Sequence, residues 1–183
     1  METADVAACL ERARRGDRPA LDELLGQLRP AVYRYCLARL RDPYAADDAT
    51  QEVILAVAVT LPRYEDRGQP FAAFVFGVAA NKVLEAHRRG RRRREESLDG
   101  ISRAPTEAKG PEEQAVLGEE AARLLALIDA LPDTQRGVLL LRVAAGLSAE
   151  ETAATLGMTS GAVRVAQHRA LARVRALAAE QPI

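Results

Sequence analysis

The chain has 183 residues, with 26 basic and 26 acidic side chains, two cysteines and no tryptophan. This length allows one ordinary domain or two small ones, and two cysteines exclude a fold held together by several disulfides. The longest uncharged stretches, 53–62 and 68–81, are shorter than the ~20 apolar residues of a membrane-spanning helix, so we expect no membrane insertion.

Composition favours helices. Alanine dominates the apolar residues and aromatic residues make up only 4% of the chain, which predicts an all-α fold. The N-terminus has acidic residues where a secretory signal has basic ones, so we expect a cytoplasmic protein. Cys9, Cys36, His87 and His168 show no metal-ligand spacing. We therefore expect two buried or half-buried thiols and no metal, cofactor or catalytic site.

Charge is strongly segregated along the chain. Residues 82–94 carry a net charge of +6, and residues 95–120 carry −6. The acidic stretch also contains Gly100, Pro105, Gly110 and Pro111 and few large apolar residues, which is typical of a flexible linker. We predict two small helical domains, 1–95 and 113–183, joined by a flexible acidic linker at 96–112.

The N-terminal half predicts helices in sequence. Apolar residues at helical spacing occupy 21–40, with a break or kink at Pro30. Asp42 and Pro43 signal the start of a helix that runs to about Leu61, and Pro62 ends it. A loop at 63–70 precedes a long helix that ends in the arginine tract 88–94. Its predicted buried stripe is Phe71, Phe74, Val75, Val78 and Leu84.

The C-terminal half predicts a helix-turn-helix. A helix over 115–131 with Leu124, Leu127, Ile128 and Leu131 on one side is followed by a break at 131–133 and a helix over 134–145. Ser148 and Glu151 form a capping box that opens a short helix to Leu156. After Gly157, a helix capped by Thr159 or Ser160 runs to about 178. Two helices joined by a short turn containing glycine are typical of helix-turn-helix motifs.

The last helix has an apolar stripe, and its other side fits DNA. Val163, Ala166, Ala170, Val174 and Leu177 cluster on a helical wheel as core. Small residues at the N-terminus allow close approach to phosphate, arginines reach base edges, and an outward valine fits a thymine methyl group. The candidates are Ser160, Gly161, Arg164, Val165, His168 and Arg169. A solvated charged helix is the alternative.

The arginine tract and the aromatic segment before it suggest a second nucleic-acid surface. Six arginines in the seven positions 88–94 suit a phosphate backbone, although a frayed, solubilising helix end would look the same. Tyr64 is the most exposed candidate for stacking on unpaired bases, whereas Phe71, Phe74 and Phe76 fit the core better.

These motifs resemble the bacterial sigma factors of the extracytoplasmic-function group over nearly the whole chain. The stretch 47–53, DDATQEV, resembles the acidic helix of the second sigma region. The resemblance implies that Asp47, Asp48, Gln51 and Glu52 bind the clamp of RNA polymerase.

The stretch 71–89 resembles the helix that melts and reads the minus-ten promoter element, and the loop 63–70 matches the segment that captures a flipped base. The implied minus-ten residues are Arg63, Tyr64, Arg67, Phe74 (where the family often has Trp), Asn81, Lys82, Arg88 and Arg89.

The second motif, from Leu131 to Arg175, resembles the fourth sigma region, whose helix-turn-helix binds the minus-thirty-five element. The resemblance implies a non-enzymatic initiation factor whose partners are core RNA polymerase, promoter DNA and an anti-sigma protein. The residues alone leave two other classes open. One is a homodimeric helix-turn-helix regulator that binds a palindrome without polymerase. The other is a helical adaptor that binds RNA or acidic proteins.

Overall fold

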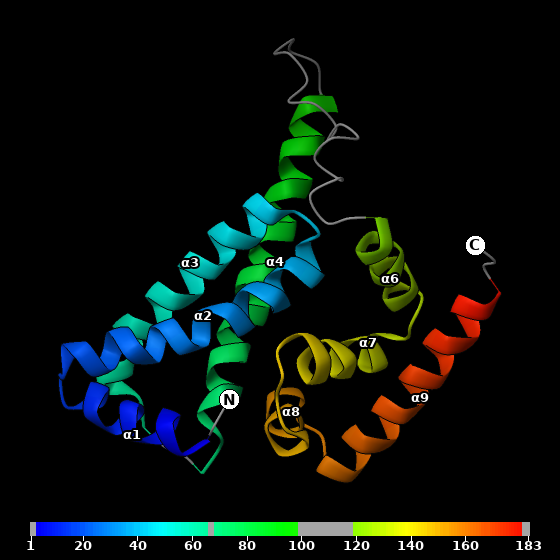
Figure 1. The fold of residues 1–183 in the computed structure, drawn as a ribbon. Helices are drawn as coiled ribbons and strands as arrows, with labels where there is room; N and C mark the ends of the chain where they lie inside the picture. Colours follow the sequence, from blue (N-terminus) through cyan, green and yellow to red (C-terminus); the bar gives the residue numbers. More distant parts are fainter. Residues whose placement is uncertain (1–2, 66–67, 99–118, 181–183) are drawn as a thin grey trace.

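The computed structural model describes residues 3–65, 68–98 and 119–180, and all regular elements among them are helical, which confirms the all-α prediction. The elements, coloured along the chain in Figure 1, are α1 (Thr3–Arg14), α2 (Arg18–Leu40), α3 (Pro43–Thr60), the 3₁₀ turn η1 (Leu61–Arg63), α4 (Phe71–Leu98), α6 (Glu119–Asp129), α7 (Asp133–Leu139), the π-helical turn η3 (Leu140–Ala144), α8 (Ala149–Leu156) and α9 (Ser160–Ala179). Residues 99–112 of the predicted linker lie outside the described residues. The domain boundaries stay a prediction.

Aspartate caps open both α2 and α3. The Asp42 carboxylate accepts hydrogen bonds from the backbone N–H of Tyr44 at 3.0 Å and of Ala45 at 3.3 Å, as the sequence predicts. Asp17 does the same for α2, accepting from Ala20 N–H at 3.1 Å, a start signal that the sequence analysis missed. This backbone bond and a side-chain bond from Arg12 lower the pKa of Asp17 below its usual value.

The core of the N-terminal unit corrects two expectations. α2 passes through Pro30 without the break that we considered, because Leu28 and Val32 on either side of it are buried and tertiary packing sustains the helix. In α4, Leu84 is 48% exposed, so its place in the buried stripe was wrong. Val75 is buried as predicted, and Phe76, Ala79 and Val83 are buried with it, while Phe71, Phe74 and Val78 are only partly buried.

Both cysteines are buried free thiols, as expected. Cys36 lies in the core beside Thr50, whose hydroxyl donates to the carbonyl of Ala46 at 2.6 Å. Burial raises the pKa of Cys36 to about 11. A thiol with so high a pKa is a weak nucleophile at neutral pH, which agrees with a packing role.

The C-terminal unit contains the predicted helix-turn-helix, formed by α8 and α9. Val163, Ala166 and Ala170 of α9 are buried, and the hydroxyl of Thr159 caps the helix by accepting from Ala162 N–H at 3.2 Å. Leu127, Ile128 and Leu131 are also buried. Leu124 is 51% exposed and so belongs to a different face of α6 from its expected companions.

The predicted capping box of α8 is present. The hydroxyl oxygen of Ser148 accepts from Glu151 N–H at 3.0 Å, and the Glu151 carboxylate accepts from Ser148 N–H at 2.7 Å. We predict that Ser148→Ala lowers the free energy of unfolding by about 1 kcal/mol, which lowers Tm by about 2–4 °C. Thermal unfolding followed by circular dichroism measures this. Ser160→Ala, which removes a serine that is not the cap of α9, should leave Tm within about 1 °C; equal losses would contradict the assignment.

The two helical units pack against each other, which the sequence did not reveal. α2 contacts η3, α4 contacts α8, and one buried cluster contains residues of both units. Arg34 donates to the carbonyl of Ala144 at 2.7 Å. Arg41 forms an ion pair with Asp129 at 2.5 Å and also donates to the carbonyl of Leu125. Figure 1 shows α6 to α9 gathered on one side of α2 and α4.

Candidate protein-binding and nucleic-acid-binding surfaces

The first candidate surface is the acidic face of α3, and its carboxylates differ in how they are held. Asp47 forms an ion pair with Arg29 at 3.1 Å and accepts from the Gln51 amide at 2.7 Å. Glu52 lies between Lys82 and Arg89 of α4, at 3.3 and 3.1 Å. Asp48 is exposed and makes no hydrogen bond or ion pair within the described part of the chain. The negative charge that remains available to a partner is therefore centred on Asp48.

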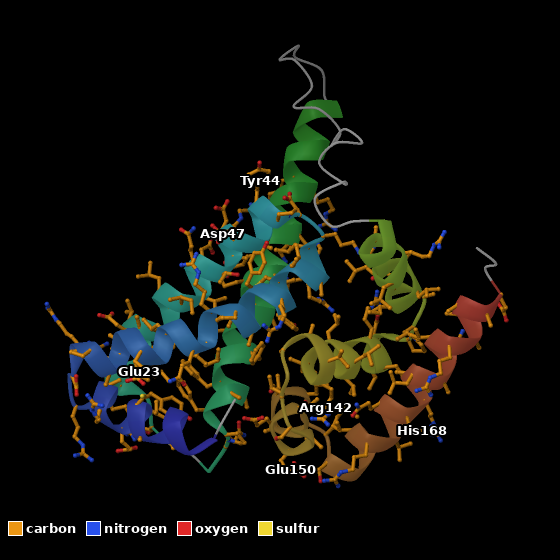
Figure 2. All side chains as sticks on the ribbon, in the orientation of Figure 1. Glu23, Tyr44, Asp47, Arg142, Glu150 and His168 are labelled. Carbon is orange, nitrogen blue, oxygen red and sulfur yellow. The ribbon has the colours of Figure 1, made fainter. Side chains whose placement is uncertain are left out.

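A groove between α3 and α4 runs beside Asp48. Gln51, Leu55, Ala86 and Gly90 are among the residues that line it. Leu55 is 66% exposed, and Tyr44 and Val59 of the same helix are 74% and 70% exposed. Figure 2 shows Tyr44 and Asp47 near the N-terminal end of α3, far from Glu23 of α2. The sequence predicted no role for these apolar residues, because their exposure is decided by how α3 packs against its neighbours.

The second candidate surface follows α4 and divides the predicted minus-ten residues into two groups. Asn81 and Arg88 are exposed and make no hydrogen bond or ion pair with another described residue. Lys82 and Arg89 instead turn toward Glu52 of α3. Hydrogen bonds to Glu85 and then Glu52 raise the pKa of Lys82 above its usual value, and the bond from Lys82 lowers that of Glu85. Lys82 and Arg89, two predicted DNA contacts, are thus bound through Glu52 to the predicted polymerase-binding face of α3.

The loop before α4 carries an aromatic cluster. The half-buried Tyr64 ring packs edge-on against Phe71, with ring centroids 5.2 Å apart, and at a tilt against Phe74, 5.1 Å away. The Arg14 guanidinium of α1 lies over the Tyr64 ring, 5.9 Å from its centroid. Arg63 is exposed beside it, and Arg67 lies outside the described residues. Phe76 belongs to the core, where it meets Tyr35 edge-on at 5.5 Å.

The third candidate surface is the outward face of α9. Gly161, Arg164, Val165, His168 and Arg169 are all exposed, and Ser160 is half-buried. His168 points outward from α9 in Figure 2. Arg164 forms an ion pair with Glu150 of α8 at 2.7 Å. Gln167 turns inward, and its side-chain oxygen accepts a hydrogen bond from Arg142 at 2.9 Å. This agrees with its predicted place near the apolar side of the helix, away from DNA.

A shallow groove between α7 and α9 adds shape to this face. Gly161, Ala162, Val165 and Arg169 line it from α9, and Thr134 and Gln135 line it from α7. The exposed fraction of Val165 is 51%, which is large for an apolar side chain with no partner in the described structure. An exposed apolar side chain beside an arginine fits a base edge with a methyl group.

No helix in the part of the chain that the structure describes has both the length and the apolar character to cross a membrane. No group of three or more histidine, cysteine, aspartate or glutamate side chains in residues 3–65, 68–98 and 119–180 could hold a metal ion.

Comparison with protein families places both units. The model of sigma-70 region 2 matches residues 24–93, and the model of sigma-70 region 4 matches residues 121–174. These matches cover the acidic helix, the aromatic and basic helix, and the helix-turn-helix. They define a DNA-binding transcription initiation factor built from two sigma regions.

Similar proteins show to which group of sigma factors the chain belongs. ECF RNA polymerase sigma factor SigD of Mycobacterium tuberculosis (strain ATCC 25618 / H37Rv) is 48% identical over 179 residues, which is 96% of this chain and 84% of SigD. ECF RNA polymerase sigma factor ShbA of Streptomyces griseus is 46% identical over 185 residues, 97% of each chain. The chain therefore belongs to the extracytoplasmic-function (ECF) sigma factors. It is an alternative sigma factor that directs promoter-specific transcription.

Solved structures agree with the fold. The structure of CnrH in complex with the cytosolic domain of CnrY is similar with a TM-score of 0.73 and 24% identity, over 97% of this chain and 99% of that one. The sigma factor RpoE in complex with the anti-sigma factor NepR, from Bartonella quintana, is similar with a TM-score of 0.61 and 19% identity, over 88% of this chain and 98% of that one.

Proposed function

We propose that the acidic face of α3 binds core RNA polymerase. The observation that carries this is Asp48, which is exposed beside the groove between α3 and α4 and has no hydrogen bond or ion pair with any residue that the structure describes. Asp47, Gln51 and Glu52 frame it, but their polar groups already have partners within the protein. A basic partner surface gains most binding free energy from a carboxylate that is not already paired with a cation of its own chain, because no internal ion pair has to break first. Exposed Tyr44 and Leu55 add apolar area to the same interface.

The minus-ten element is assigned to α4 and the loop before it. Asn81 and Arg88, which make no hydrogen bond or ion pair with other described residues, are assigned to DNA contact from α4, together with Phe74. Arg63, Tyr64 and Arg67 of the loop are assigned to capture of the flipped base. Lys82 and Arg89 act as DNA contacts only after they leave Glu52. Both ion pairs are partly exposed and so contribute little stability, which makes such an exchange inexpensive.

The minus-thirty-five element is assigned to α9. Ser160 and Gly161 allow the helix N-terminus to approach the phosphate backbone, Arg164, His168 and Arg169 supply donors, and Val165 supplies the apolar contact. Glu150 competes for Arg164 in the free protein.

Simultaneous binding of both elements requires the two units to separate. Two elements centred 25 base pairs apart lie about 85 Å apart on B-form DNA. A compact chain of this length has a radius of gyration of about 16 Å, hence a diameter of about 40 Å. The contacts that Arg34 and Arg41 make with the C-terminal unit must therefore break when the protein occupies a promoter.

The chain is proposed to work in the cytoplasm without a cofactor, because the chemistry of RNA synthesis belongs to the polymerase. An anti-sigma protein is the further partner that we propose, since RpoE, a similar fold, was solved in complex with the anti-sigma factor NepR.

Promoter opening tests this function. Core polymerase and the protein are added together to a promoter fragment taken from a genomic pool, and permanganate oxidation maps unpaired thymines. We expect reactivity near the minus-ten element only when both proteins are present. Reactivity without polymerase, or none with it, would contradict the proposal. The homodimeric regulator predicts instead a palindromic footprint from this protein alone, and the adaptor predicts no promoter preference.

A further inference from the structure

The aromatic cluster of the minus-ten loop is held from a distant part of the chain. Arg14 is the last residue of α1, and its guanidinium lies over the ring of Tyr64, 5.9 Å from the ring centroid. Phe71 and Phe74 pack against the same ring, at 5.2 and 5.1 Å. α1 is held in place by packing, because Cys9 and Ala13 on its other side are buried in the core shared with α2.

Arg14 keeps donors available in this arrangement. A cation–π contact at 5.9 Å uses the charge of the guanidinium and does not require its N–H groups to donate hydrogen bonds to the ring. One of them donates to Glu11, with the two atoms 3.0 Å apart. The side chains of Arg14 and Glu11 are 30% and 55% exposed, and such an ion pair contributes little stability. A phosphate can therefore replace Glu11.

Single-stranded nucleic acid is bound where aromatic faces and cations alternate, since bases stack on the first and phosphates pair with the second. The Tyr64 cluster with Arg14 has this composition, whereas Lys82 and Arg89, farther along α4, are engaged by Glu52. Arg14 therefore contacts the aromatic cluster directly and is placed to meet a phosphate beside it.

We propose that Arg14 binds a backbone phosphate of the unpaired promoter strand next to Tyr64, so that α1 completes the minus-ten site. This inference rests on the proposed role of the loop. It assigns a DNA contact to a residue outside the stretch 63–89 to which the resemblance confines the minus-ten site.

The test is the salt dependence of binding by the assembled polymerase complex. The probe is a fluorescently labelled 15-nucleotide single strand that carries the minus-ten element of a promoter opened by the wild-type protein. Its dissociation constant is measured between 50 and 200 mM KCl. Each phosphate contact to single-stranded DNA contributes about 0.7 to the slope of log K against log salt. We expect Arg14→Gln to lower the slope by about 0.7 and to weaken binding roughly ten-fold at 100 mM.

Two further variants separate a phosphate contact from a structural role. Arg15→Gln is the matched control, since Arg15 is 78% exposed and also pairs with Glu11, at 3.9 Å, but does not touch Tyr64; its slope should equal that of the wild type. Arg14→Lys keeps the charge and should keep the slope. A weaker Arg14→Gln complex with an unchanged slope would show that Arg14 only positions Tyr64, and would overturn the proposal. Failure of the wild-type complex to bind the strand would overturn the role of the loop itself, and Arg14 with it.

Discussion

Asp48→Arg should abolish polymerase-dependent transcription while the protein stays folded. Asp48 is exposed and has no partner in the described structure, so its reversal breaks no internal contact. At an interface, loss of one member of a desolvated charge pair costs about 2–5 kcal/mol, and reversal adds repulsion. We therefore expect core polymerase to bind the variant roughly 30-fold or more weakly. Fluorescence anisotropy of the labelled protein titrated with core polymerase measures this.

Glu23→Arg is the control for this variant. Glu23 is also an exposed helical carboxylate, but it lies on α2, far from Tyr44 and Asp47 (Figure 2). Its reversal should leave polymerase affinity within about two-fold, as is usual for surface changes away from an interface. Glu52→Arg is a poorer test, because it would place a third cation beside Lys82 and Arg89. Equal affinities for Asp48→Arg and the wild type would refute the proposed polymerase-binding face.

Arg169→Ala should remove most of the preference for an intact minus-thirty-five element. Arg169 is exposed, has no partner among the described residues and lines the groove next to Val165. A bidentate contact from arginine to a base provides about 1–3 kcal/mol of discrimination. The ratio of run-off transcript from an intact promoter to that from one with a scrambled upstream element should fall by roughly 5- to 150-fold.

Arg175→Ala provides the matched control on the same helix. Arg175 is exposed but lies nearer the C-terminal end of α9, beyond the half that enters a major groove. Its removal should leave the ratio of the two transcripts unchanged. If Arg169→Ala lowered transcription equally on both templates, Arg169 would contact phosphate or stabilise the fold, and base recognition would have to be assigned elsewhere on α9.

Local signals in the sequence predicted the helices from α2 onward because each signal depends on neighbouring residues, whereas α1 was not predicted. The Asp42 cap, the Ser148 capping box and the apolar stripe of α9 need only positions within a few turns, and all are present. Leu84 was misplaced because α4 has apolar residues on more than one face. Only packing against α2 and α3 decides which face is buried.

Which charged residues of the candidate surfaces are already paired depends on contacts between elements far apart in the sequence, and hydrophobic periodicity does not show such contacts. The pairs that neutralise Glu52 span 30 and 37 positions, and Arg14 meets Tyr64 across 50. The docking of the two units through Arg34 and Arg41 spans more than 80 residues. The sequence could therefore name the acidic and basic residues, but not which of them are already paired.

Run-off transcription tests the central claim most directly. Core RNA polymerase is incubated with a pool of promoter fragments, with and without this protein. We expect transcripts with defined start sites that need both proteins and disappear with Asp48→Arg but not with Glu23→Arg. Absence of such transcripts, together with tight binding of this protein alone to a palindromic site, would contradict that claim.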